Sequence, residues 1–266
     1  MQFLIGFALS GLIGLLSLRM RALSPNGAVA AFITGGLIFG FGGIAWGVLL
    51  VTFFITSSVL SKAFTRRKAA FNEKFAKGSQ RDWGQVLANG GLGAVLALVL
   101  AFFPKEPAIW LAFAGAMAAV NADTWSTELG VLSSTPPRLV SNWKVVERGT
   151  SGGVSLLGTA SALAGAALIG LLTAAFTREG GFWLVWGSVT LGGLAGALFD
   201  SCLGATVQAI YHCPTCQKET ERHPRHSCGT PTAQVRGWRW LNNDMVNFAC
   251  SSMGALVALL VWLIAL

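Results

Sequence analysis

The sequence predicts an all-α, polytopic membrane protein with about seven or eight membrane segments. The 266 residues are 53% hydrophobic, with a mean hydropathy of +0.62, and apolar runs long enough to cross a bilayer recur along the chain. Only 11% of the residues are charged, and most of these lie between the apolar runs. We therefore interpret residues 1–266 as one integral membrane domain.

The first half of the chain predicts five segments, at about 2–18, 28–40, 43–61, 85–103 and 108–122. The first lacks a preceding basic region and a small-residue cleavage site, so it is expected to be a membrane helix and not a signal peptide. Gly40, Gly42 and Gly43 separate the second segment from the third. The second is short enough to be a tilted or re-entrant half-span, which leaves the count uncertain by one.

The second half predicts three more segments, at about 153–176, 182–208 and 244–265. In the middle one, small or polar residues recur every four positions and form one stripe: Gly192, Gly196, Asp200, Gly204 and Gln208. Glycines of this kind let a neighbouring helix pack closely. An acid within a membrane helix is costly unless it has a partner, so Asp200 is predicted to be functional.

The basic residues predict the topology. With these eight segments, 17 of the 19 Lys and Arg fall on one side (2 in 19–27, 7 in 61–85, 3 in 123–153 and 5 in 200–245), and only Lys105 and Arg178 fall on the other. The positive-inside rule makes the first side cytoplasmic. We expect a cell (inner) membrane protein with both termini outside, a basic cytoplasmic loop at 62–85, and a net charge of +8 that reflects topology and not nucleic-acid binding.

A cytoplasmic loop at 123–153 is the predicted active site, because it combines carboxylates with basic and Gly/Ser/Thr-rich segments. Carboxylates suit Mg²⁺, and the candidates for ligands of the ion or its water shell are Asp123, Glu128, Asp200 and Asp244. Asp123 and Glu128 are about 140° apart on a helix, so both face one ion only if the helix ends near Trp125, as we expect. Supporting ligands for the ion or its nucleotide are Asn121, Asn243 and Asn247.

Phosphate groups are expected to bind the basic side chains of this loop and the amides at the mouth of the following helix. These candidates are Arg138, Lys144, Arg148, Thr150, Ser151, Gly152 and Gly153. The alternative is a polar loop with ordinary helix caps, since Thr150, Ser151 and Asn243 are all residue types that cap helices.

Residues 209–240 form a second polar excursion, which contains a C-x2-C pair followed by a His/Cys pair. Cys213, Cys216, His226 and Cys228 are four ligands suited to a tetrahedral Zn²⁺, with His212 and His223 as replacements. Four protein ligands leave no open position, so this zinc is expected to be structural. The alternative is a set of unligated thiols.

Together these motifs resemble the integral membrane family that contains phytyl-phosphate kinase and transmembrane protein 19. The resemblance runs from Arg21 and SPNG (24–27) through NADTWSTELG (121–130), PRL (137–139), GTSGGVS (149–155) and DSCLGATVQ (200–208) to NDMVN (243–247). It implies a membrane kinase that transfers a phosphoryl group from a nucleoside triphosphate, with CTP expected, to an isoprenyl monophosphate such as phytyl phosphate.

The partners expected from this reading are the nucleotide, the isoprenyl phosphate lipid and the bilayer, and the sequence leaves open whether the chain forms a homo-oligomer. Two other readings remain. A secondary transporter would use the same carboxylates to bind an ion or a proton near the middle of the membrane. A non-catalytic scaffold would use the zinc excursion to bind a protein, but would leave the intramembrane acids unexplained.

Overall fold

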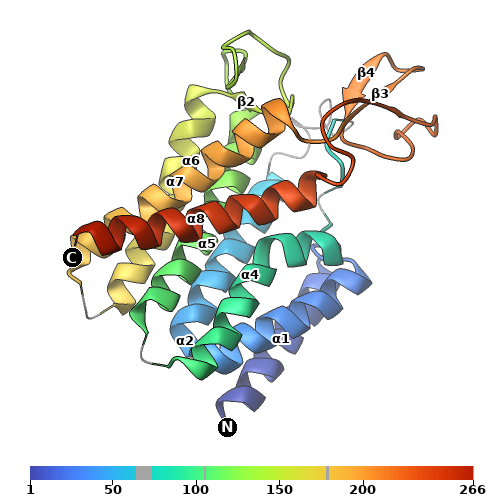
Figure 1. Ribbon diagram of the computed structural model, residues 1–266. Helices are drawn as coiled ribbons and strands as arrows, with labels where there is room; N and C mark the ends of the chain where they lie inside the picture. Colours follow the sequence, from blue (N-terminus) through green and yellow to red (C-terminus); the bar gives the residue numbers. More distant parts are fainter. Residues whose placement is uncertain (64–73, 79, 105, 178–179, 266) are drawn as a thin grey trace.

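Long helices make up most of the chain and pack into a single bundle (Figure 1). The computed structural model describes residues 1–63, 74–78, 80–104, 106–177 and 180–265. Within these residues the helices are α1 (Gln2–Arg19), α2 (Pro25–Ala63), α4 (Trp83–Phe102), α5 (Pro107–Gly130), α6 (Leu156–Phe176), α7 (Phe182–Thr206) and α8 (Asn243–Ala265). The polytopic helical class is confirmed. Five basic residues used in the topology prediction lie outside the described residues: Arg66, Arg67, Lys68, Lys105 and Arg178.

Six of the described helices are long and apolar enough to cross a membrane, slightly fewer than the seven or eight segments predicted. Two features account for the difference. α2 counts once, although it holds both of the segments expected at 28–40 and 43–61. α5 is not among the six, because polar residues fill its second half, although its first half is the most buried part of the bundle.

α2 is folded back on itself at Gly43. This residue has φ 74° and ψ −159°, a conformation that glycine adopts without strain. The two arms then run side by side: Leu50 lies next to Gly35, and a methyl group on Gly47 would overlap the ring of Phe39. The first arm also packs against α1, where the Ser10 hydroxyl donates to the Phe32 carbonyl over 2.8 Å.

Contacts at the two ends of the bundle show how the helices alternate. At one end the Gln2 amide donates to the Gly40 carbonyl, the Trp110 indole donates to Thr177, and Trp262 lies beside Gly180. At the other end the Ser24 amide donates to Arg81, and Ser61 donates to Glu128. Both termini therefore lie at the end away from the polar loops, as Figure 1 shows.

Glycines bring α5, α7 and α8 into close contact. A methyl group on Gly254 would lie 2.5 Å from the Ala119 methyl and 2.6 Å from the Gly115 carbonyl oxygen. A methyl group on Gly192 would lie 2.6 Å from the Gly254 carbonyl oxygen, and one on Gly196 would lie 2.7 Å from that of Cys250. The close packing predicted for the glycine stripe of α7 is thus present, and α8 and α5 are its partners.

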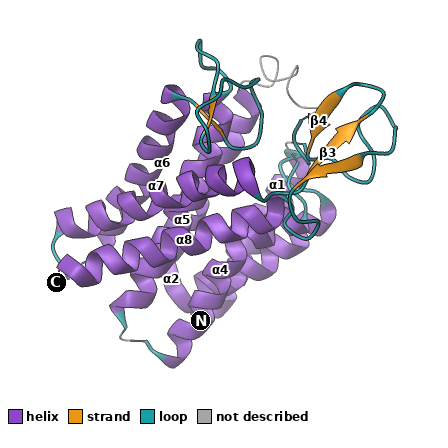
Figure 2. Cartoon of the chain, turned by 45° about the horizontal axis from the view of Figure 1, so that its top comes forward, coloured by secondary structure: helices purple, strands orange, loops and turns teal. Residues whose placement is uncertain are grey.

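In the described part of the chain, short strands lie in the polar segments that follow α5 and α7 (Figure 2). β1 (Arg138–Leu139) pairs antiparallel with β2 (Gly153–Val154). β3 (Ile210–Cys213), β4 (Lys218–Thr220) and β5 (Ala233–Arg236) form an antiparallel sheet in the order β4-β3-β5. Both sheets lie at the polar end of the bundle, so they build the loops that surround the site.

Replacing Gly254 with Leu should destabilise the protein, because the new side chain has no room between α5 and α8. Overpacking of this kind costs about 1–3 kcal/mol of the free energy of unfolding, and the backbone contact here places the change at the upper end. The matched control is Gly187→Leu in α7, where an added Cβ meets no heavy atom within 4 Å. Thermal unfolding in detergent should show a clear loss for the first variant only; equal melting temperatures would contradict this packing.

Candidate active site

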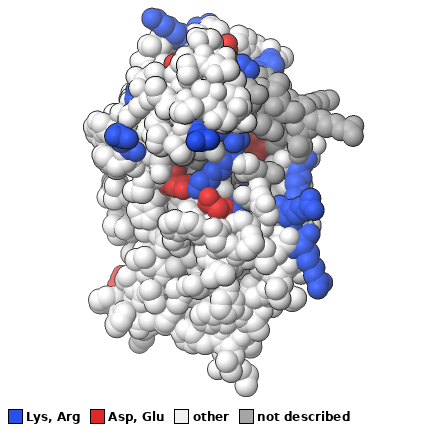
Figure 3. All heavy atoms as spheres, turned by 90° about the vertical axis from the view of Figure 1, so that its right-hand side faces the viewer, with Lys and Arg blue, Asp and Glu red and all other residues white. Residues whose placement is uncertain are grey.

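A polar cavity of about 470 Å³ opens at the polar end of the bundle. Figure 3 shows the molecule from the right-hand side of Figure 1. Acidic and basic side chains gather in a recess on the face shown, and the lower half of that face carries almost no charge. Side chains from α4, α5, α7 and α8 line the cavity together with the loops. The charged residues in its lining are Lys77, Arg81, Asp123, Glu128, Arg148, Asp200, Glu221 and Arg222.

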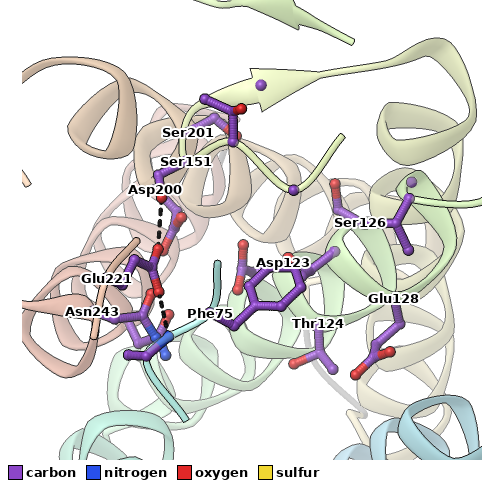
Figure 4. A pocket seen from close by; sticks show the side chains of 18 of the residues that line it. Phe75, Asp123, Thr124, Ser126, Glu128, Ser151, Asp200, Ser201, Glu221 and Asn243 are labelled. Carbon is purple, nitrogen blue, oxygen red and sulfur yellow. Dashed lines mark hydrogen bonds between the residues drawn. The ribbon is translucent and has the colours of Figure 1, made fainter. Parts of the chain in front are cut away.

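Three carboxylates face the same part of the cavity, although they come from distant parts of the sequence. Asp123 lies in α5, Asp200 in α7, and Glu221 just after β4 (Figure 4). Asp200 is close enough to Asp123 and Glu221 for their charges to interact. Like charges in a poorly solvated site repel, so this arrangement favours the binding of a cation.

Glu221 holds several segments of the site together, and the sequence analysis did not identify it. Its Oε1 accepts hydrogen bonds from Ser151 (2.6 Å) and Gln208 (2.9 Å), and its Oε2 accepts one from the Ala76 amide (3.1 Å). Burial raises the pKa of this carboxyl above its ordinary value, and these three bonds oppose the rise. Nothing in the sequence separates Glu221 from the other polar residues of its excursion.

One carboxylate oxygen of Asp200 is available to bind a ligand. Its Oδ2 is buried and has no hydrogen-bond partner among the described residues. A buried carboxylate oxygen without a partner costs free energy, and a bound cation would remove that cost. The three carboxylates do not converge tightly, since the only group of three or more His, Cys, Asp or Glu ligand atoms found within 4.8 Å of one another in the described chain is the Cys/His cluster.

Glu128 lies away from the other three carboxylates, and our expectation that α5 ends near Trp125 is wrong. The helix continues to Gly130, so the loop begins at Val131, and Asp123 and Glu128 point in different directions. Glu128 accepts a hydrogen bond from Ser61 of α2 and interacts with the charge of Arg81. One ion bound directly by both Asp123 and Glu128 does not fit this geometry.

Asp244 lies beside the cavity and is paired with a cation. Lys77 donates to its Oδ2 and also to the N-cap residue of α4, Asp82, over 2.9 Å. Burial lowers the pKa of Lys77, but the bonds and charges of the two carboxylates outweigh it, and the pKa is raised overall. Lys77 therefore connects α4 to α8 and brings a positive charge to the cavity wall.

Besides Asp244, three of the residues predicted to bind Mg²⁺ or phosphate are not part of the cavity lining: Asn121, Arg138 and Lys144. Asn121 is fully buried, where it donates to the Gly165 carbonyl and accepts from Thr56, so its amide is used in helix packing. Arg138 and Lys144 are exposed. Arg138 lies on β1 and donates to the Trp143 carbonyl.

The Gly/Ser/Thr segment lines the cavity, but it is not at a helix mouth. α6 begins at Leu156 and is capped by Ser155, so Thr150 and Ser151 are not its caps. Within the predicted phosphate cradle, the Thr150 amide donates to Glu147 and the Gly153 amide donates to Thr150. Two of the four amides from 150 to 153 are thus already used inside the loop.

Close contact with α7 explains why Gly152 stands in this loop. Its φ is 80°, and a Cβ there would lie 2.3 Å from the Ala205 amide nitrogen. This approach brings Ser151 to Glu221. Arg148, Thr150, Ser151, Gly152 and Gly153 therefore all reach the cavity through the loop.

At the start of α8, Asn243 and Asn247 both line the cavity. The capping role belongs to the preceding residue, since the Asn242 Oδ1 accepts from the Met245 amide over 3.1 Å. The sequence left open that Asn243 is only a helix cap, but Asn242 already fills that role.

The predicted cysteine and histidine ligands form a compact cluster outside the cavity, on the β3–β4–β5 sheet. The ligand atoms of Cys213, Cys216, His226 and Cys228 all lie within 4.8 Å of one another. The Cys213 and Cys228 sulfurs are 3.5 Å apart, and the Nδ1 of His226 is 3.4 Å from the Cys228 sulfur. The cysteines are not in disulfides, and the group could hold a metal ion.

Comparisons with known proteins agree on one family. The family described as "Integral membrane protein DUF92" matches residues 8–255. The Arabidopsis thaliana protein PGR is 35% identical over 93% of this chain and 92% of its own length. The uncharacterized membrane protein MJ0933 of Methanocaldococcus jannaschii is 35% identical, over 70% of this chain and 75% of its own. The chloroplastic A. thaliana protein VTE6 is 27% identical over 91% of this chain and 66% of its own. No solved structure matches the chain.

The Cys/His cluster should bind about one divalent metal ion per chain, because its four ligand atoms already converge. Cys213→Ser should abolish the bound metal and lower the melting temperature, since metal binding and folding of such a module are coupled. Cys202→Ser is the control, because Cys202 is an exposed free cysteine outside the cluster. Elemental analysis checks both variants, and wild-type protein without metal would refute the site.

Proposed function

The chain belongs to the integral membrane family DUF92, and from this we propose that it is a membrane kinase acting on an isoprenyl monophosphate. The donor is a nucleoside triphosphate, with CTP expected, and the product is the isoprenyl diphosphate. Phytyl phosphate represents the class of acceptor. The single observation that carries this proposal is a cavity that combines three carboxylates with cationic side chains at the end of an apolar bundle.

The chemistry of phosphoryl transfer suits these residues. An oxygen of the acceptor phosphate attacks the terminal phosphorus of the nucleotide, a new P–O bond forms, and the bond to the bridging oxygen breaks to release the nucleoside diphosphate. The acceptor is already an anion, so the reaction needs no strong general base. The described residues that line the cavity supply carboxylates, amides, hydroxyls and cations, and no histidine is among them. All three histidines of the chain lie in the excursion at 209–240.

Mg²⁺ fits the carboxylates of the cavity. Asp200 has a buried oxygen without a partner, and Asp123 and Glu221 face it. We assign Asp123 and Asp200 to direct contact with the ion, Glu128 and Asp244 to its water shell, and Asn243 and Asn247 to the water shell or to nucleotide phosphates. Bound Mg²⁺ would neutralise phosphate charge, and it commonly keeps several waters, which suits ligands that do not converge tightly.

The chain's own cations are proposed to hold the phosphates. Lys77 is fixed between two carboxylates, and Arg148 is fixed by a bond to the Ser134 carbonyl. Arg138 and Lys144 lie outside the cavity, so they would act only if the loop moved. Thr150 and Ser151 add residues with hydroxyl groups to the lining of the same cavity.

The position of the acids favours the kinase over a secondary transporter. Asp123 lies seven residues before the end of α5, and Asp200 lies six residues before the end of α7. At 1.5 Å per residue both are about 10 Å from the polar ends of their helices, in the half of each helix nearer that end, and both line the cavity that opens there. A carrier would instead place its ion ligands near the middle of the membrane.

Zinc is the metal we propose for the Cys/His cluster. Three sulfurs and one imidazole are ligands that zinc prefers in tetrahedral sites, where Zn–S bonds of about 2.3 Å place sulfur atoms about 3.8 Å apart. The Cys213–Cys228 separation of 3.5 Å is close to this value. This ion would hold together the sheet that carries Glu221 and would take no part in the reaction.

Asp200→Asn and Asp123→Asn should lower the rate of transfer at least about a hundredfold while leaving the protein folded. Each removes a charge from the metal-phosphate site with little change in volume, and such transition-state contacts contribute several kcal/mol. Glu219→Gln is the control, because Glu219 is exposed on β4 and does not line the cavity. Product formation is measured with Mg²⁺ and with EDTA, which should abolish it. Gradient-driven uptake into proteoliposomes, without nucleotide-dependent product, would favour the transporter.

The polar end of the bundle should face the cytoplasm, with both termini outside, because most of the basic residues lie at that end. A cysteine introduced at Glu106 should react with an impermeant maleimide added to intact cells, whereas one introduced at Asn142 should not. Both positions are exposed in loops at opposite ends of the bundle. The parent chain gives the background from its native cysteines. Labelling of Asn142 but not Glu106 would invert the orientation.

A further inference from the structure

A second, smaller cavity lies beside the polar one. It has a volume of about 80 Å³ and lies between α1, both arms of α2, and α4. Its lining is predominantly apolar and includes Ile13, Leu23, Leu50, Phe53, Phe54 and Val86. Arg81, Gln85 and Asn89 line both cavities, so the two share a wall. A ligand with one polar end and one apolar chain could occupy both.

Gly90 shows that this cavity is open space within the bundle. The residue is buried, yet a Cβ added to it would meet no heavy atom within 4 Å. The facing helices line the cavity with small residues, Gly14, Ala31 and Gly35, which leave this space unfilled. An empty apolar cavity does not hold water well and favours an apolar occupant.

Arg81 lies at the shared wall and is held firmly in place. Its guanidinium donates to Ser58 over 3.1 Å and lies 5.7 Å from the ring centres of Phe53 and Phe54. Burial lowers the pKa of this guanidinium to about 10, and the charge of Glu128 opposes the shift, so Arg81 remains charged at neutral pH. It is therefore a fixed cation between a polar and an apolar space.

The turn at 24–27 explains how Arg81 is positioned. The Arg81 amide donates to Ala22, and its carbonyl accepts from the Ser24 amide. The Ser24 hydroxyl caps the start of α2 by accepting from the Gly27 amide. A Cβ on Gly27 would lie 2.3 Å from the Arg81 carbonyl oxygen, so only glycine allows this approach.

We propose that the smaller cavity binds the phosphate-proximal part of the isoprenyl chain and that Arg81 binds the acceptor phosphate. This inference rests on the proposed function and assigns the acceptor to the α1–α2–α4 side of the site. Asp123 of α5 and Asp200 of α7 then lie on the donor side. A single narrow cavity fits one branched chain better than the two acyl chains of a phospholipid, and its small volume admits only the first part of a long chain.

The test uses two neighbouring glycines of α4. Gly90→Leu places its Cβ in the open space of the cavity, whereas Gly91→Leu adds the same side chain at the next position, which does not line it. With geranylgeranyl phosphate as the acceptor, Gly90→Leu should raise the acceptor KM at least tenfold and leave the nucleotide KM unchanged. Gly91→Leu should leave both unchanged. Melting temperatures confirm that both variants are folded.

A second readout does not depend on turnover. A diazirine derivative of geranylgeranyl phosphate, carrying the photoreactive group near the phosphate, should label peptides of α1, α2 or α4 in the wild type and in Gly91→Leu, and much less in Gly90→Leu. Arg81→Gln should weaken this labelling, and Arg81→Lys should restore part of it.

The outcomes separate this inference from the function on which it rests. Labelling elsewhere in the bundle, or equal behaviour of Gly90→Leu and Gly91→Leu, would overturn the chain-binding cavity even if the kinase activity is present. Labelling in the cavity as described, with no product from any nucleotide, would refute the kinase while supporting a site for a prenyl phosphate.

Discussion

The close approach of α5, α7 and α8 is the constraint on which the site depends. Gly115, Gly192, Gly196 and Gly254 remove the side chains that would otherwise hold these helices apart. Because the helix axes come so near one another, Asp123 on α5 and Asp200 on α7 reach the same cavity, and α8 adds Asn243 and Asn247. In a membrane there is little hydrophobic gain from helix association, so small residues and close packing supply much of the specificity.

A second constraint follows from the apolar surroundings. Carboxylates that face one another near a bilayer are stabilised by cations or by hydrogen bonds, and the structure supplies both in part. Glu221 receives three hydrogen bonds, Asp244 and Asp82 share Lys77, and the buried Oδ2 of Asp200 has no partner among the described residues. Buried carboxylates cost free energy when the site is empty, and a metal ion with bound phosphates would offset that cost.

The sequence predicts the parts of this account that depend on local pattern. Hydrophobic runs predict the membrane class, a four-residue spacing predicts the glycine stripe of α7, and ligand types predict the Cys/His cluster. It fails where tertiary contacts decide. Glu221 and Lys77 come from loops in which many other residues are also polar, and Arg138 is exposed on β1, a strand that forms by pairing with β2. The polar second half of α5 looks like a loop, but contacts such as that of Glu128 with Ser61 keep it helical to Gly130.

The central claim is that groups from α5, α7, α8 and the loops form one site for direct phosphoryl transfer. The most direct measurement follows the fate of the terminal phosphate of a nucleoside triphosphate labelled at that position, with purified protein, Mg²⁺ and an isoprenyl monophosphate. The account predicts that the label appears at the terminal phosphorus of the isoprenyl diphosphate, one label for each nucleotide consumed. Label found only in inorganic phosphate, or left in the nucleotide with every acceptor and donor tried, would contradict it.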